Sequence, residues 1–123
     1  MGSKNSLIRV CDCTEIIKRC IADSDKYDAV YQSRGLYTHV QKRHPESLPY
    51  LSCVADIITH PDYYGIDPHE SGKSVELVKV LSQNVYVGIK VDPSDKYLYV
   101  ATIYTITSSK LENRVNSGRL TKI

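Results

Sequence analysis

The spacing of apolar residues changes after Gly72, and this change restricts the fold more than any other feature of the chain. Before it, apolar side chains recur every three or four residues, as on one face of a helix; after it, they alternate with polar ones, as in a half-buried strand. Three alternating segments, at residues 74–81, 85–92 and 97–106, are separated only by the short turns SQN and PSDK. Strands joined by such short turns pair antiparallel. The sequence therefore predicts an antiparallel β-meander of three to four strands, with residues 119–123 as the candidate for a fourth.

The chain before the sheet shows mostly helical patterns. Weak alternation over residues 6–11 predicts one short strand first. Asp12 and Glu15 have the spacing of a capping box, which predicts that a helix starts there. Its apolar stripe consists of Ile16, Ile17, Cys20 and Ile21. The polar run at residues 23–28 ends this helix.

A second helix is predicted over residues 34–43, with Ser33 as its N-cap. Its apolar positions at helical spacing are Leu36, Tyr37 and Val40. Pro45 disfavours helical geometry at the residue before it, so the helix should end at about Arg43.

Two further helices complete the pattern. Ser47 can cap a third helix with Pro49 in its first turn, and residues 59–72, rich in Pro and Gly, should form a loop. A capping-box pattern at Ser109 predicts a last helix over about 110–117. Helices followed by strands indicate an α+β fold, in which N-terminal helices pack on the meander and a short helix lies near the C-terminus.

The composition fits a single globular domain spanning residues 1–123. The chain has 41% apolar and 24% charged residues, and its net charge of +2 is too small to indicate nucleic-acid binding by itself. Any electrostatic footprint must therefore be a local patch. No segment has the apolar run of a signal peptide or a membrane span, so we expect a cytoplasmic protein that does not enter a membrane.

The four cysteines are expected to be reduced thiols. A zinc site would need two close pairs of Cys or His ligands, and Cys11 with Cys13 is the only close cysteine pair. We therefore expect no metal. The chain also has ten Tyr but no Phe and no Trp. Some of these rings should lie at half-buried or ligand-facing positions, although Tyr can also simply replace Phe in the core.

Two histidines and two cations lie close together in the segment LYTHVQKRHP. His39 and His44 are five residues apart, which separates them by about 140° around a helix axis, whereas metal ligands on a helix favour a spacing of four. His39 does align with Arg43. Because Pro45 ends the helix, His44 can turn towards the same cleft. The spacing argues against a metal and permits an acid–base pair or a phosphate site; the alternative is a solvated helix face.

Two other groups of polar residues are candidates. The first is a set of C-terminal cations: Lys110, Arg114, Arg119 and Lys122. Arg geometry suits phosphate oxygens, although an exposed charged helix would look the same. The second is a set of polar residues that interrupt apolar strands and face one way: Glu76, Lys90, Thr102 and Tyr104. They mark either a functional surface or simply the solvent face of an antiparallel sheet.

Four segments together resemble a known family. They are YQSRGLYTHVQKRHPE (31–46), DIITHPDYYGIDP (56–68), SVELVKVLSQNVYVGIKVD (74–92) and LYVATIYTITSSKLENRVNSGRL (98–120). In this order they resemble the phage-associated branch of the barnase/EndoU/colicin/RelE-like nucleases, the PBECR domains. The resemblance covers residues 31–123 and implies N-terminal helices packed on a four-stranded antiparallel sheet. It also implies a metal-independent endoribonuclease without cofactors, of a phage, mobile-element or toxin type.

The chemistry implied by the resemblance is transesterification. A general base removes the proton from the ribose 2′-hydroxyl, a general acid protonates the leaving 5′-oxygen, and cations stabilise the charge on phosphate. An imidazole can serve in either proton role near neutral pH. The matching catalytic candidates are His39, His44, Thr102 and Arg119. The matching RNA-binding candidates are Lys42, Arg43, Lys90, Lys110, Arg114, Ser117, Tyr63 and Tyr64. The two tyrosines could stack on a base or pack under the sheet.

A different class of function stays open at this point. The same fold could form a catalytically inactive RNA-binding or protein-interaction module. The chain could also be a structural phage or mobile-element protein whose nuclease fold has decayed. The expected partners are RNA, with transfer RNA as one candidate, and a cognate inhibitor or immunity protein.

Overall fold

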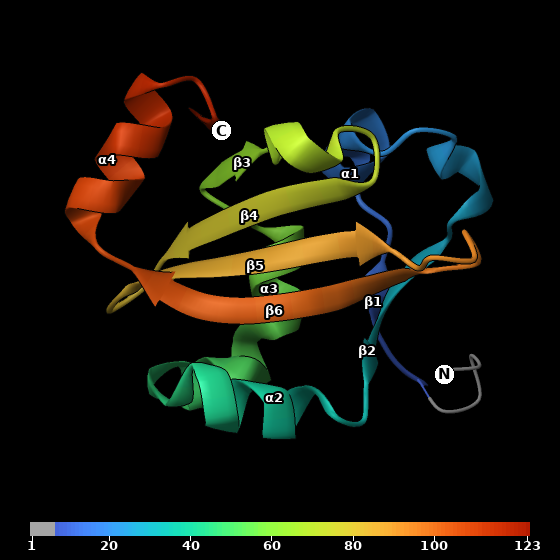
Figure 1. Ribbon diagram of the computed structural model, residues 1–123, viewed down its shortest axis with the longest axis horizontal. Helices are drawn as coiled ribbons and strands as arrows, with labels where there is room; N and C mark the ends of the chain where they lie inside the picture. Colours follow the sequence, from blue (N-terminus) through green and yellow to red (C-terminus); the bar gives the residue numbers. More distant parts are fainter. Residues whose placement is uncertain (1–6) are drawn as a thin grey trace.

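A mixed β-sheet runs through the molecule (Figure 1). The computed structural model describes residues 7–123, and within this range seven strands form one sheet in the order β1-β2-β6-β5-β4-β3-β7. The strands are β1 (Leu7–Asp12), β2 (Ala29–Ser33), β3 (Tyr63–Gly65), β4 (Ser74–Val80), β5 (Asn84–Val91), β6 (Leu98–Ile106) and β7 (Leu120–Lys122). Neighbouring strands are antiparallel except for β2 and β6, which pair in parallel.

The α+β class agrees with the prediction, but the predicted architecture is wrong. The meander exists as β4, β5 and β6, yet it is only the centre of a seven-stranded mixed sheet, not an antiparallel sheet of three to four strands. The strand expected at residues 6–11 corresponds to β1, Leu7–Asp12, and Ser6 lies outside the described residues. Ser33 ends strand β2 where a helix cap was expected. The helices therefore alternate with strands along the first half of the chain and form no separate N-terminal group.

The helices are short. They are α1 (Glu15–Cys20), α2 (Leu36–Arg43), α3 (Val54–Thr59) and α4 (Ser108–Asn116), with 3₁₀ turns η2 (Ser24–Lys26), η3 (Pro45–Cys53) and η4 (Pro68–Glu70). In residues 7–123 no helix is long and apolar enough to cross a membrane. The predicted loop at residues 59–72 contains β3 and η4, and the predicted third helix is a 3₁₀ segment that continues into α3.

The N-caps of α1 and α4 each differ from the predicted cap by two residues. Thr14, not Asp12, caps α1, because its hydroxyl accepts a hydrogen bond of 3.3 Å from the Ile17 N–H. Thr107, not Ser109, caps α4 in the same way, accepting from the Lys110 N–H at 3.1 Å. Both caps are threonines one residue before the helix, a position that the Asp/Ser-x-x-Glu patterns did not select.

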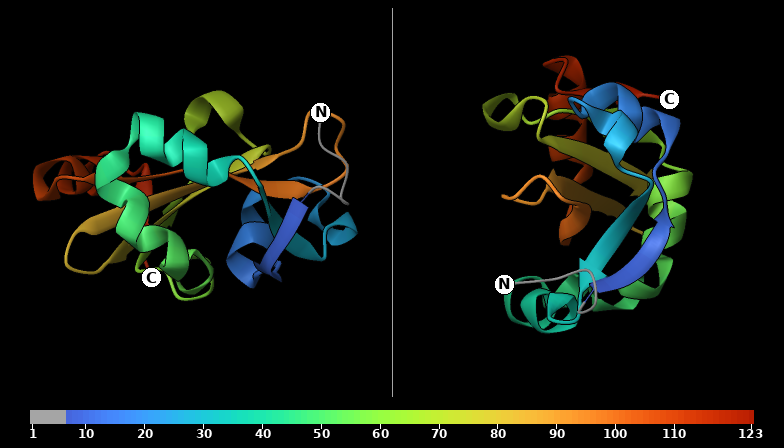
Figure 2. Two further views of the ribbon diagram at one scale, coloured as in Figure 1. Left: turned by 90° about the horizontal axis from the view of Figure 1, so that it is seen from below. Right: turned by 90° about the vertical axis from the view of Figure 1, so that its right-hand side faces the viewer.

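The two faces of the central strands have different surroundings. On the back face, apolar residues of β4, β5 and β6 pack against α1 and α3, which lie behind the sheet (Figures 1 and 2). The fully buried ones include Val75, Leu77, Val85, Val87, Ile89, Leu98 and Ile103. On the front face, the face seen in Figure 1, α4 covers one end through Leu111 and α2 lies along β6. Within residues 7–123 no helix covers the front face between α2 and α4.

A β-bulge changes the front face in its middle. Gly88 of β5 pairs with Thr102 of β6, but the next residue of β5 pairs with Val100, which leaves Ala101 as an extra residue in β6. Val100 is therefore directed into the core, where it is 2% exposed. Tyr99 shares the front face with Thr102, although the two are an odd number of residues apart.

Candidate active site

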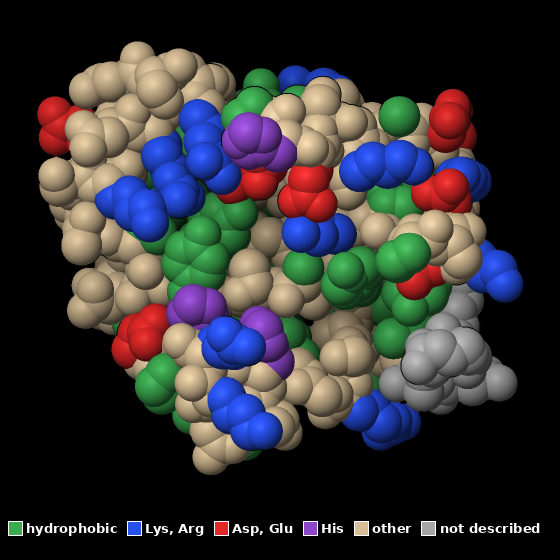
Figure 3. All heavy atoms as spheres, viewed as in Figure 1, with side chains coloured by type: hydrophobic (Ala, Val, Ile, Leu, Met, Phe, Trp, Pro, Cys, Tyr) green, Lys and Arg blue, Asp and Glu red, His purple; other side chains and the backbone are tan. Residues whose placement is uncertain are grey.

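A groove lies on the front face where α2 meets strands β5 and β6. It has a volume of about 470 Å³ and is lined by His39, Arg43, His44, Lys90, Ala101 and Thr102. The space-filling view shows histidine side chains over α2, Lys and Arg side chains over α4, and hydrophobic side chains between them (Figure 3). We call this pocket the groove.

The end of α2 places both histidines in the groove. The helix ends at Arg43, as the position of Pro45 predicted. His44 then leaves helical geometry, with φ −143° and ψ 60°, while its N–H still donates to the Val40 carbonyl at 2.7 Å. Its ring centroid lies 6.4 Å from that of His39. Five-residue spacing thus brings the imidazoles to one pocket because the second follows the helix and is not part of it.

Two cations and a threonine complete the groove. Arg43 is exposed, and the Lys90 ammonium lies 3.0 Å from a carboxylate oxygen of Glu70. Thr102 lies opposite Gly88, where a Cβ would meet a Thr102 methyl at 3.4 Å and the Tyr86 ring at 3.3 Å. The missing side chain keeps space open towards an adjoining pocket of about 150 Å³, which shares Lys90 and Thr102 with the groove.

A buried carboxylate lies at the far side of this adjoining pocket. Glu76 is 1% exposed and accepts hydrogen bonds from Arg119 Nε at 2.7 Å, Arg119 Nη2 at 2.6 Å and the Tyr86 hydroxyl at 2.5 Å. The hydrogen bonds to Glu76 raise the pKa of Arg119, and burial together with the bond to Glu76 raises that of Tyr86. Arg119 therefore stays charged and Tyr86 stays a neutral donor across the physiological range.

A row of rings connects α4 with α2 across the front face. The guanidinium carbon of Arg114 lies 5.6 Å from the centroid of the Tyr86 ring. Tyr86 stacks on Tyr104 at 4.4 Å and 15°, and Tyr104 lies 5.0 Å from the His44 ring. In residues 7–123, Arg114 Nη1 is the buried side-chain nitrogen left without a hydrogen-bond partner. Through this row, the Tyr104 ring packs against one side of the His44 ring.

The structure brings some of the predicted site residues together and leaves others apart. His39, His44 and Thr102 line the groove, whereas Arg119 lines a different pocket and contacts Glu76 and Asp67, which line the adjoining pocket. Of the predicted RNA-binding residues, Arg43 and Lys90 also line the groove.

The other predicted RNA-binding residues lie outside the groove. Lys42 and Lys110 are exposed on α2 and α4, and the Ser117 hydroxyl donates to the Arg114 carbonyl at 3.1 Å. Tyr63 and Tyr64 lie in β3, where both are half-buried and pack against buried apolar residues of the core. Tyr64 also lines the pocket that contains Arg119, and stacking of either ring on a base stays a prediction.

The sequence marks Glu76 only as a polar residue in an apolar strand, without a catalytic or RNA-binding role, and it does not single out Tyr86. Glu76 had a signal, since a charged residue interrupts an apolar strand there, and the structure confirms that it shares a face with Lys90, Thr102 and Tyr104. The sequence gives no indication that Arg119 pairs with Glu76. This ion pair joins β4 to the residue before β7, so it depends on the order of the strands in the sheet.

The described residues also bear on metal binding. In residues 7–123 no three or more His, Cys, Asp or Glu side chains are grouped so that they could hold a metal ion. In the same part of the chain all four cysteines are free. Metal independence of the reaction stays a prediction for experiment.

The fold and the groove define an α+β protein with two imidazoles and two cations on an open sheet face. A family model described as phage-Barnase-EndoU-ColicinE5/D-RelE like nuclease 3 matches residues 11–113. The chain therefore belongs to this family of nucleases. The match includes His39, His44, Lys90 and Thr102 and ends just before Arg114. Comparison with curated proteins and with solved structures gives no match.

Proposed function

We propose that the protein is a ribonuclease that cleaves RNA by 2′-hydroxyl transesterification in the groove. One observation carries this proposal: His39, His44, Arg43, Lys90 and Thr102 line a single pocket on the open face of the sheet. Imidazoles supply proton transfer near neutral pH, and the cations supply charge for phosphate. Membership in a nuclease family supports the same conclusion.

The proposed reaction needs two proton carriers. One imidazole of the His39 and His44 pair removes the proton of the ribose 2′-hydroxyl, whose oxygen then forms a bond to the neighbouring phosphorus. The other imidazole protonates the 5′-oxygen as its bond to phosphorus breaks. The products are a 2′,3′-cyclic phosphate and a 5′-hydroxyl. Lys90 and Arg43 stabilise the phosphorane charge, and the Thr102 hydroxyl donates to a phosphate oxygen.

Arg119 has a positioning role in this proposal. A lone carboxylate at Glu76 would repel an incoming phosphate from the adjoining pocket. The two hydrogen bonds from Arg119 neutralise that charge and hold the carboxylate in place. Arg119 thus lets the adjoining pocket accept an anion, although Arg119 does not itself line the groove.

Cleavage of end-labelled RNA in EDTA tests the proposal. We expect a 2′,3′-cyclic phosphate product, and we expect no cleavage at a position where the nucleotide carries a 2′-hydrogen. His39→Ala and His44→Ala should each slow cleavage by at least about a hundredfold. His60→Ala is the matched control, because His60 is an exposed histidine that follows α3 and hydrogen-bonds to Thr59.

Three results would count against the proposal. Equal rates for the His39, His44 and His60 variants would show that the groove is not the site. Cleavage at a 2′-deoxy position would exclude the reaction type. Binding of RNA without cleavage, at low salt where phosphate contacts are strongest, would favour the inactive RNA-binding module instead. If the protein is a toxin-type nuclease with a cognate inhibitor, the wild type alone should yield less protein on expression than His39→Ala.

A further inference from the structure

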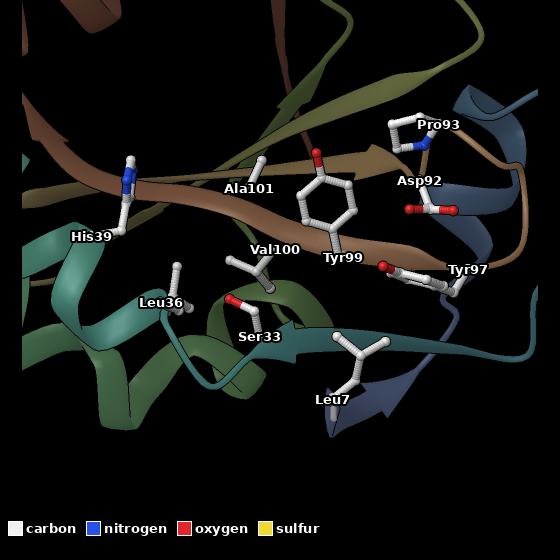
Figure 4. Close-up of a pocket in the computed structure, with 10 residues that line it drawn as sticks. All are labelled: Leu7, Ser33, Leu36, His39, Asp92, Pro93, Tyr97, Tyr99, Val100 and Ala101. Carbon is white, nitrogen blue, oxygen red and sulfur yellow. The ribbon is translucent and has the colours of Figure 1, made fainter. Parts of the chain in front are cut away.

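A second pocket opens beside the groove, between β6, α2 and the N-terminal strands (Figure 4). It has a volume of about 370 Å³, which lies within the range of small-molecule sites. His39 and Ala101 line both this pocket and the groove, so the two pockets are neighbours. A chain that places a phosphate in the groove can therefore place the attached nucleoside here.

The walls of this pocket are aromatic and apolar. Tyr97 and Tyr99 lie side by side, with ring centroids 6.2 Å apart at 67°, and both are half-buried (Figure 4). Leu36 and Val100 close the base of the pocket, and both are buried. Flat faces of this kind favour stacking with a planar ring, because every nucleobase has a π-face that can lie against a tyrosine.

The charges of the two pockets are opposite. The groove carries Arg43 and Lys90, whereas the ionisable acid of the second pocket is Asp92. The Ser94 hydroxyl and N–H both donate to Asp92 Oδ2, and these bonds hold the pKa of Asp92 below its usual range. An ionised carboxylate repels phosphate but accepts hydrogen bonds from the N–H groups of a base edge. The charge pattern thus assigns phosphate to the groove and the base to the second pocket.

We propose that the pocket formed by Tyr97, Tyr99 and Asp92 binds one nucleobase of the RNA whose phosphate lies in the groove. This subsite rests on the proposed function for its RNA substrate, but its binding can be measured without cleavage. The β-bulge at Ala101 shapes this subsite, because it brings Tyr99 onto the front face that also carries Thr102. Stacking supplies affinity for any base, and Asp92 supplies preference among bases by accepting from their N–H donors.

Titration with the four nucleoside 3′-monophosphates and with inorganic phosphate tests this subsite. Wild-type protein should bind the best nucleotide at least about tenfold more tightly than inorganic phosphate. Tyr99→Leu should lose most of that advantage, with phosphate binding unchanged, and Tyr99→Phe, which keeps the ring, should restore it. Tyr37→Leu is the control, because Tyr37 is a 57% exposed tyrosine on α2 that does not line the pocket.

A second variant tests the carboxylate. Asp92→Asn keeps the size of the side chain but replaces an acceptor with a group that also donates. It should change the ranking of the four nucleotides by about tenfold for at least one pair. An unchanged ranking would remove Asp92 from the subsite.

The outcomes separate this inference from the proposed function. If Tyr99→Leu binds nucleotides as tightly as the wild type, or if nucleotides bind no better than phosphate, the base subsite is wrong even when RNA is cleaved. If nucleotide binding depends on the Tyr99 ring but no RNA is cleaved, the subsite stands and the ribonuclease proposal fails. Retained cleavage together with a Tyr99-dependent KM supports both.

Discussion

Arg119 binds Glu76 through two parallel hydrogen bonds, and the two residues belong to parts of the sheet that are not adjacent. Glu76 lies in β4 and Arg119 directly precedes β7, with β3 between these strands. Gly65 of β3 pairs with Glu76 on one side and with Leu120 on the other. The ion pair therefore bridges a strand at the point where that strand has no side chain.

Removing the guanidinium should destabilise the protein strongly. In Arg119→Ala the Glu76 carboxylate stays buried without its cation, and we expect a loss of about 3 kcal/mol in the free energy of unfolding. Arg119→Lys should lose less, because it keeps the charge but not the paired geometry. Urea unfolding measures both. Lys122→Ala, at an exposed residue of β7, is the control; a similar small effect for Arg119→Ala and Lys122→Ala would contradict the structural role of the pair.

A side chain at position 65 should displace the segment that carries Arg119. A Cβ on Gly65 would lie 2.0 Å from the Arg119 carbonyl oxygen and 2.9 Å from a Leu120 methyl, so the backbone at Arg119 must move. Gly65→Ala should cost several kcal/mol of stability, on the order of an overpacked core site or more. Gly35→Ala is the comparison, since its Cβ would meet nothing closer than 3.9 Å. Equal thermal midpoints for the two variants would refute the close approach.

The N-cap of α4 can be tested against the residue that the sequence favoured. Thr107→Ala removes the hydroxyl that accepts from Lys110 N–H and should cost about 1 kcal/mol. Ser109→Ala, within the first turn and exposed, should change stability by less than about 0.5 kcal/mol. Chemical denaturation of both variants decides between the two caps, and a larger loss for Ser109→Ala would restore the capping-box prediction.

Alkaline pH should reveal the burial of Cys11. Burial raises the pKa of its thiol from 9.0 to about 11, because the thiolate is poorly solvated inside the protein. Below about pH 9 both the folded and the unfolded chain carry the neutral thiol, so its contribution to stability is complete. Between pH 9 and 11 the unfolded chain ionises first, and the free energy of unfolding falls.

The matched variant for this effect is Cys11→Ala. It lacks the thiol but keeps the other cysteines, so the wild type should lose about 1–2 kcal/mol relative to it between pH 8 and pH 10.5. Urea unfolding at both pH values, with reductant present, gives the difference. If the two proteins lose stability in parallel, the Cys11 thiol ionises equally in both states and is not shielded.

The sequence predicted the parts of the fold that depend on local spacing. Period-two alternation identified β4, β5 and β6, and Pro45 identified the end of α2 at Arg43. Alternation also placed Glu76 and Thr102 on one face, which the register confirms. Each of these inferences needs only neighbouring residues, so no knowledge of the remaining chain was required.

The errors concern pairing between distant segments. Ser33 is compatible with both a helix cap and a strand end, and only the pairing of β2 with β1 and β6 decides for the strand. Tyr63–Gly65 lie in a Pro- and Gly-rich stretch, and they form a strand because β4 and β7 pair on either side. The second pocket was also missed, since the bulge that shapes it cannot be read from alternation alone.

The parallel pairing of β2 with β6 affects the order of events during folding. Val30 pairs with Leu98, more than half of the chain away, whereas β4, β5 and β6 are joined by short turns. Closing such a long loop costs more entropy than forming a hairpin, so the meander should form before β2 docks on it. Because α2 follows β2, the two histidines reach the sheet only at that late step. The chain can therefore be largely folded while the groove still lacks both imidazoles, which separates the formation of the sheet from the completion of the proposed site.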